Sequence, residues 1–159
     1  MIKVTLITLG KLKEKYLRDA VEEYKKRLSR YCNLNIVEIE PVKLPEKPSE
    51  NEIFQALEKE SDEILKKIPK ESLVFSLCIE GKEFSSTDFA RKIESSSNMG
   101  KNITFIIGSS YGLSQKIKNE SDVRLSVSQM TFPHQLFRVM LLEQIYRAFK
   151  INEGSSYHK

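Results

Sequence analysis

The chain has 159 residues, which is near the usual size of one domain, and 40% of them are hydrophobic and 30% are charged. This apolar content is enough for a buried core and excludes an intrinsically disordered chain. Lysine and arginine number 26 against 22 acidic residues, so the net charge of +4 mildly favours an anionic partner without identifying one.

The first residues after Met1 enter a strand pattern directly, with no basic leader or long apolar segment. No later apolar run approaches the length that spans a membrane. Cys32 and Cys78 are too few to build a metal site, and we expect both to be reduced structural thiols. The sequence therefore predicts a cytoplasmic protein with no metal and no membrane contact.

The first third of the chain predicts a strand, a helix and a second strand. Residues 2–9, IKVTLITL, are rich in β-branched residues and predict a strand. Residues 17–31 carry apolar side chains at helical spacing, with basic residues on the other faces. Residues 34–40 predict a second strand, and the proline-rich residues 41–48 then predict either a surface loop or a mobile lid.

The middle of the chain predicts a long helix and a buried strand. Ser49 and Glu52 match a capping box, and the helical pattern that follows them continues to Pro69. Residues 73–79 form a continuous apolar run that predicts a buried strand, after which Gly81 is expected to turn the chain.

The remaining elements complete an alternation of strands and helices. Ser85 caps a shorter helix, and residues 103–107 predict another buried strand. A short helix at 113–118, a strand within the sequence VRLSV and a long helix at 133–151 follow. This order predicts a single α/β domain with a mostly parallel sheet flanked by helices.

Two loops follow predicted strands and are candidate ligand sites, because ligands of open α/β sheets bind beyond the carboxyl ends of strands. The first loop is Gly108–Gly112, for which a simple tight turn is the alternative. It lacks the dinucleotide fingerprint and the phosphate-loop lysine, which argues against nicotinamide and ATP chemistry. The second loop is Ser128–His134, which leads into the last helix.

The second loop predicts a cleft at the start of the last helix. Pro133 suits the first helical turn, so Thr131 or Phe132 is expected at the N-cap. His134 then lies on the first turn, where it serves either as a structural residue or as a group that orients a substrate or moves a proton.

The last helix and the tail also have two interpretations each. The helix at 133–151 is apolar on more than one stripe, which predicts a homodimer through this helix or deep burial within one chain. The terminal Tyr157, His158 and Lys159 combine a stacking ring, a titratable group and a cation, which suits an RNA base and phosphate or a disordered tail.

The sequence LSVSQMTFPHQLFRVMLLEQIYRAFKI, with the terminal YHK, resembles the RlmH-type family of SPOUT-class methyltransferases of large-subunit ribosomal RNA. The opening GKLK, the helix sequence EYKKRL, the IEGK segment and Ile107-Gly108 extend the resemblance over the whole chain. It implies a trefoil knot in the C-terminal part, a homodimer and a substrate-binding tail at 152–159. It also implies methyl transfer from S-adenosylmethionine to N3 of a pseudouridine in 23S rRNA, with the assembled ribosome as the expected substrate.

The resemblance implies roles for individual residues. Cofactor contacts fall on Leu77, Gly108, Val127, Ser128, Gln129, Met130, Thr131 and Phe132. His134 or His158 becomes the group that deprotonates or orients the substrate, Tyr157 stacks on RNA and Lys159 meets phosphate. The chain departs from the family at Ser109, where a glycine is frequent. A non-catalytic RNA-binding module and a small-molecule α/β enzyme are the alternative functions.

Overall fold

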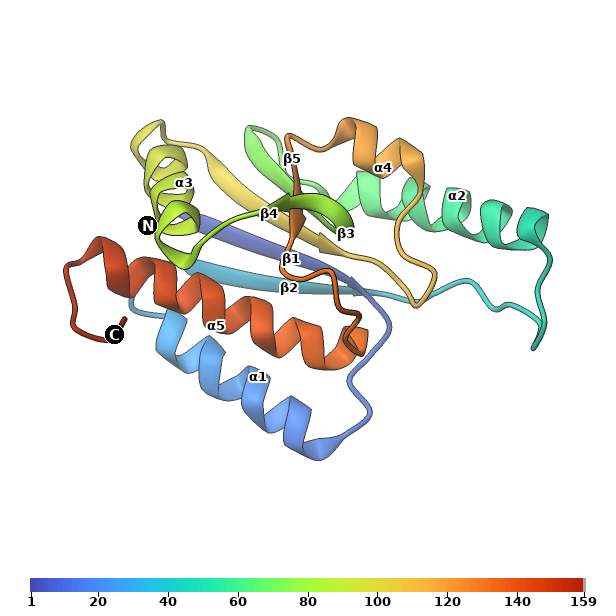
Figure 1. Cartoon of the computed structure of the whole chain (residues 1–159), viewed down its shortest axis with the longest axis horizontal. Coiled ribbons are helices and arrows are strands. Elements are labelled where there is room, and N and C mark those ends of the chain that lie inside the picture. The colour runs from blue at the N-terminus through green and yellow to red at the C-terminus, as the bar shows by residue number, and fades with distance from the viewer. Residues whose placement is uncertain (159) are drawn as a thin grey trace.

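The order of strands and helices is the one that the sequence predicts. In the computed structural model, which describes residues 1–158, ten elements alternate along the chain (Figure 1). They are β1 (Lys3–Leu9), α1 (Lys15–Leu28), β2 (Asn33–Ile39), α2 (Glu50–Lys67), β3 (Ser72–Glu83), α3 (Ser86–Asn98), β4 (Asn102–Ile107), α4 (Gln115–Glu120), β5 (Val123–Ser126) and α5 (His134–Asn152).

The five strands form one sheet in the order β2-β1-β4-β3-β5, and every pair is parallel. The central strands β1 and β4 pair in register from Val4 with Ile103 to Thr8 with Ile107. Both of these strands are buried on their two faces, which explains their continuous apolar sequences. The prediction of an α/β fold with a parallel sheet is therefore confirmed.

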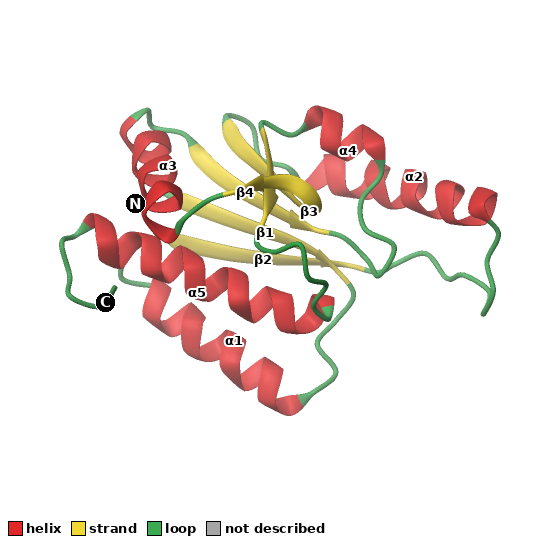
Figure 2. Ribbon diagram, viewed as in Figure 1, coloured by secondary structure: helices red, strands yellow, loops and turns green. Residues whose placement is uncertain are grey.

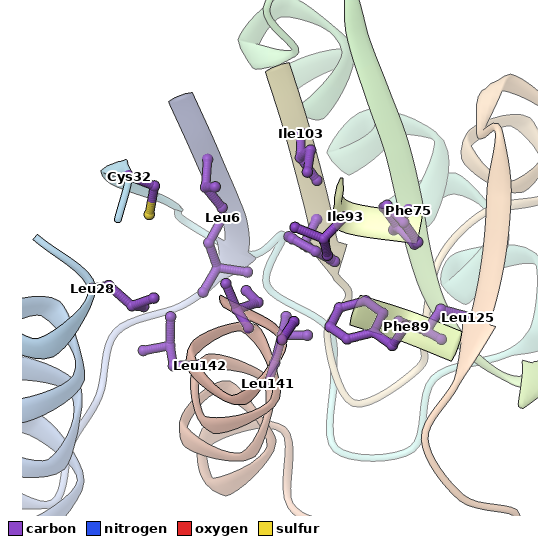
Figure 3. Packing of buried hydrophobic residues seen from close by; sticks show 14 of the residues in the cluster. Leu6, Leu28, Cys32, Phe75, Phe89, Ile93, Ile103, Leu125, Leu141 and Leu142 are labelled. Carbon is purple, nitrogen blue, oxygen red and sulfur yellow. The ribbon is translucent and has the colours of Figure 1, made fainter. Parts of the chain in front are cut away.

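Helices cover both faces of the sheet (Figure 2). Buried hydrophobic residues form one cluster on each face. On one face, α1, α3 and α5 pack against Leu6, Phe75 and Phe105 in the larger of the two clusters (Figure 3). On the other face, α2 and α4 cover strand residues that include Ile7 and Ile106. Successive side chains of a strand thus point to opposite faces of the sheet, and a different set of helices covers each face.

Serine residues fix the starts of three helices. Ser49 and Glu52 form the predicted capping box at α2, where each side chain accepts a hydrogen bond from the other residue's backbone N–H at 3.1 Å. Ser85 caps α3 as predicted. Ser114 caps α4, so this helix begins at Gln115, two residues later than the sequence suggested.

The prediction that Gly81 ends the third strand is wrong. β3 continues to Glu83, and Leu125 of β5 pairs with both Leu77 and Lys82 of β3. The intervening residues 78–81 form a bulge, which is common beside functional sites. Gly81 is needed there because a Cβ atom would lie 2.7 Å from the backbone carbonyl oxygen of Arg124.

The last helix starts differently from the prediction. Pro133 itself occupies the N-cap with a non-helical backbone, and its carbonyl accepts from the N–H of Phe137 at 2.9 Å, so neither Thr131 nor Phe132 is the cap. His134 is on the first turn, as expected. α5 contacts α1 and α3 along its sides and buries Leu141 and Ile145 against the sheet. Part of its apolar surplus is therefore buried within one chain.

The structure also bears on the cysteines, on membrane-spanning segments and on metal sites. Both cysteines are free, and burial raises the pKa of the Cys32 thiol to about 12. Within residues 1–158, no helix has the length and apolar content to cross a bilayer. The same residues contain no group of three histidine, cysteine or acidic side chains arranged for a metal ion.

Candidate active site

A cleft of about 720 Å³ opens at the carboxyl ends of β3, β4 and β5. Because the strands are parallel, the loops that follow them meet at one edge of the sheet, which is where both candidate loops were predicted to lie. The amino-terminal turn of α5 closes the cleft on one side. The cleft is lined by residues 77–80, 107–113, 118, 125, 127, 128, 130–134 and 137.

The loop after β4 is both a tight turn and a wall of the cleft. The N–H of Gly112 donates to the carbonyl of Ser109 at 2.8 Å, which closes the turn. Gly112 has a φ of +81°, a conformation that side chains disfavour. A Cβ on Gly108 would overlap the carbonyl of Gly112, so this glycine is required by close backbone approach.

The loop after β5 is organised by serine side chains. Ser128 Oγ accepts a hydrogen bond from the N–H of Met130 at 3.0 Å, and Ser126 Oγ donates to the carbonyl of Ser128 at 3.2 Å. Met130 is 75% exposed, and Ile79 and Tyr111 are about half exposed on the other loops of the cleft. Three large apolar side chains thus stand at the cleft unburied, which is typical of a site that encloses a ligand.

The lining of the cleft includes most of the residues that the resemblance assigned to the cofactor. Seven of those eight residues lie on it, namely Leu77, Gly108, Val127, Ser128, Met130, Thr131 and Phe132. Gln129 does not line the cleft. Tyr111 of the predicted Gly108–Gly112 loop also lines the cleft, whereas the sequence interpretation missed Cys78 and Phe137. Phe137 had a signal, because it lies three residues after His134 on the same helix face.

His134 is the titratable group at the α5 side of the cleft. Burial lowers the pKa of this imidazole, and the positive charges of Arg138 and Lys13 lower it further. The neutral ring is therefore the main form near pH 7, and it can accept a proton from a bound substrate.

The opposite wall carries an ion pair and a thiol. Lys118 of α4 donates to the carboxylate of Glu80, and this hydrogen bond holds the pKa of Glu80 below its usual range. Burial raises the pKa of the neighbouring Cys78 thiol. The thiol form of Cys78 is therefore favoured near neutral pH.

The Gly108–Gly112 loop is supported by a buried carboxyl group of α2. Glu60 is only 5% exposed and accepts a hydrogen bond from the N–H of Val42 at 3.0 Å. Burial raises the pKa of Glu60, and hydrogen bonds from Val42 and the Ser109 side chain partly oppose this effect. Glu60 therefore connects the proline-rich segment to the loop of the cleft.

Glu60→Gln should raise the melting temperature at pH 7 by a few degrees. Since the folded pKa lies above the unfolded value of about 4.3, ionisation of Glu60 destabilises the fold as pH rises through the interval between the two values. Glutamine stays neutral and keeps an acceptor for Val42. Thermal melts at pH 7 and near pH 4 should show the gain only at the higher pH, and an equal shift at both would contradict this assignment.

The tail packs against the outer side of α5. Tyr157 donates from its hydroxyl to Glu143 at 2.7 Å, and this hydrogen bond raises the pKa of Tyr157. Arg147 lies over the Tyr157 ring, 4.9 Å from its centre, and donates to Nδ1 of His158 at 3.1 Å. Lys159 falls outside the described residues.

The tail follows the carboxyl end of α5 (Figure 1), whereas the cleft is lined by residues at the amino end of this helix. Arg147, which holds His158, follows His134 by thirteen residues, or about 20 Å along an α-helix. Tyr157 and His158 are absent from the lining of the cleft. The structure therefore brings His134 together with the predicted cofactor residues but leaves the described tail residues apart from them within one chain.

Comparison with known families matches residues 2–158 to the family described as "Predicted SPOUT methyltransferase". The chain belongs to the SPOUT methyltransferase family. A relative from Methanococcus maripaludis is 55% identical over 99% of this chain and 100% of its own length. Ribosomal RNA large subunit methyltransferase H of Clostridium tetani is 54% identical, and its namesake from Clostridium acetobutylicum is 52% identical, over the same shares.

Membership of the SPOUT family agrees with the observed sheet and gives the protein a chemical class. SPOUT proteins of this group are methyltransferases by name, and the cleft joins the last three strands with the start of the last helix. The trefoil knot remains the fold that the family implies for this same C-terminal part.

Proposed function

We propose that the protein transfers a methyl group from S-adenosylmethionine to N3 of a pseudouridine in 23S ribosomal RNA, on the assembled ribosome in the cytoplasm. The cleft between the glycine loop and the start of α5 is the observation that carries this proposal. The names of the full-length relatives, which are ribosomal RNA large subunit methyltransferases, support the choice of substrate.

The cleft suits a nucleoside-sized ligand in volume and composition. Its volume of about 720 Å³ lies within the range of small-molecule sites. Leu77, Val127 and Phe132 supply apolar walls for an aromatic ring, and the close backbones of Gly108 and Ser128 offer amides and carbonyls to base edges. S-adenosylmethionine would supply a methyl group activated by its sulfonium charge.

The residues of the chain contribute positioning and proton transfer. N3 of the pseudouridine would have to lose its proton in order to accept the methyl group. The neutral imidazole of His134 is the candidate acceptor in the cleft, since its lowered pKa keeps it unprotonated. Most of the rate enhancement then comes from holding the nucleophilic nitrogen in line with the methyl group.

A homodimer through α5 would bring the tail of one subunit to the cleft of the other. Leu136 is 38% exposed, and Phe137, Val139 and Met140 are half-buried, so α5 keeps an apolar strip that a second copy can cover. In a two-fold arrangement with antiparallel α5 helices, the carboxyl end of one helix lies beside the amino end of the other. Tyr157 and His158 would then stack on and orient the RNA base in the partner's cleft.

Purified protein incubated with radiolabelled S-adenosylmethionine and either ribosomes or free RNA tests the proposal. We expect methylation of ribosomes, with His134→Ala or His158→Ala slowing the reaction by about 100-fold or more. Normal rates in both variants would refute the catalytic assignment. A protein that binds ribosomes but not S-adenosylmethionine in calorimetry would instead be a non-catalytic binding module.

A further inference from the structure

A second cavity, of about 310 Å³, lies between α1, β2 and α5, outside the cleft described above. It is lined by Lys11, Leu12, Arg18, Val21, Glu22, Lys25, Ile36, Glu38 and Arg138, which we call the basic cavity. Four of these side chains are cationic and two are carboxylates, so the lining carries an excess of two positive charges. Such an excess around a concave surface attracts an anion.

The charges of the basic cavity are only partly matched within the chain. Lys25 pairs with Glu22 at 3.3 Å, and Arg138 pairs with Glu38 at 2.8 Å. Lys11 makes no ion pair among residues 1–158. Arg18 donates only to backbone carbonyls, so its charge also lacks a carboxylate partner in that part of the chain.

Arg138 is a buried part of the basic cavity and is held by hydrogen bonds. It is only 2% exposed, and it donates from one Nη to Glu38 and from the other to the carbonyl of Gly10 at 3.1 Å. Its Nε has no acceptor among the described residues. Glu38 balances the charge of Arg138, but the buried Nε remains an unused donor in a residue of the cavity lining, and arginine is well suited to phosphate.

The loop that carries Lys11 is fastened to the start of α5. Arg18 donates to the carbonyl of Lys13 at 2.7 Å, and the N–H of Lys13 donates to the side chain of Gln135 at 3.1 Å. Arg138 and His134 are four residues apart on one helix face, about 6 Å along the axis. The basic cavity is therefore held in a fixed position next to the cleft.

We propose that the basic cavity binds a backbone phosphate of the substrate RNA, close to the nucleotide that enters the cleft. This inference rests on the proposed function, because it assigns a contact to the same RNA. The recognition is independent of base sequence, since phosphate contacts position a strand rather than specify it. Lys11 and Arg18 provide the exposed charges, and Arg138 provides the fixed charge behind them.

The test compares Lys11→Gln with Lys26→Gln, which removes an exposed lysine of α1 outside the basic cavity. Ribosome binding is measured by co-sedimentation at several KCl concentrations, without a methyl donor. We expect Lys11→Gln to weaken binding by about 5–10-fold and to lower the salt slope by about one unit, while Lys26→Gln changes neither. Lys11→Arg, which keeps the charge, should restore binding.

The outcomes separate this inference from the proposed function. Equal affinities and salt slopes for Lys11→Gln and the wild type would overturn the phosphate site, even in an active enzyme. Lys11-dependent binding by a protein that never methylates ribosomes would keep the phosphate site and refute the proposed reaction. A last experiment titrates the protein with inorganic phosphate in a calorimeter. If free phosphate saturates the cavity but ribosome binding does not depend on Lys11, the RNA contact is refuted.

Discussion

Replacing Gly108 with alanine should weaken binding of S-adenosylmethionine by about 30–100-fold, the equivalent of about 2–3 kcal/mol. The new Cβ would overlap the carbonyl of Gly112 and lie 3.0 Å from Leu113 Cγ. Neither backbone can retreat easily, since the N–H of Gly112 is bonded to Ser109 and β4 is paired on both edges. The overlap is relieved by moving the loop that forms one wall of the cleft. Isothermal calorimetry measures the effect directly.

Gly112→Ala is the matched control within the same loop. Nothing lies within 4 Å of its Cβ position, so this variant suffers only the strain of a φ of +81°. We expect it to lose about 1 kcal/mol of stability and much less affinity than Gly108→Ala. Equal losses of affinity in the two variants would mean that loop strain, rather than the close approach at Gly108, controls the cleft.

Mixed dimers should show that the tail acts across subunits. One chain lacks residues 157–159 but keeps an intact cleft, and the other carries Gly108→Ala but keeps an intact tail. At a concentration of S-adenosylmethionine well below saturation, the truncated homodimer should lose methylation by about 100-fold or more, and the Gly108→Ala homodimer by about 30–100-fold. Random mixing at equal ratio should restore about a quarter of the wild-type activity, because half of the dimers then contain one complete site. Initial methylation rates on ribosomes measure the recovery.

The geometry makes the result of the mixing experiment decisive. A tail that served its own cleft would leave both kinds of subunit defective in the mixed dimer, and no activity would return. The truncated homodimer should still bind S-adenosylmethionine normally, since the proposed contacts of Tyr157 and His158 are with the RNA base rather than with the cofactor. A truncated chain with lost cofactor affinity would place the tail in the cofactor site instead.

The local structure of the fold could be predicted from the sequence, whereas its long-range pairing could not. Helical periodicity and the serine caps at Ser49 and Ser85 gave the elements in their correct order, because these signals act over a few residues. The strand order and the bulge at 78–81 depend on contacts between distant segments. Gly81 looked like a turn, but it accommodates the backbone of β5.

The position of the candidate cleft could be predicted from the sequence, but its full lining could not. The two loops follow parallel strands, so the general rule for α/β sheets places them together. Cys78 enters the lining through the bulge of β3, and Phe137 enters through the packing of α5, neither of which is a local property. The separation of the tail from the cleft likewise required the position of Arg147 on α5.

The pairing of β1 with β4 has a consequence for how the chain is made. Lys3 and Asn102, which are joined by a hydrogen bond at the edge of this pairing, are 99 residues apart in sequence. During synthesis β1 can find β2 early, but its other edge must wait until about two thirds of the protein has left the ribosome. The middle of the sheet therefore closes late, and folding should be slow for a protein of this size because so many contacts are distant in sequence.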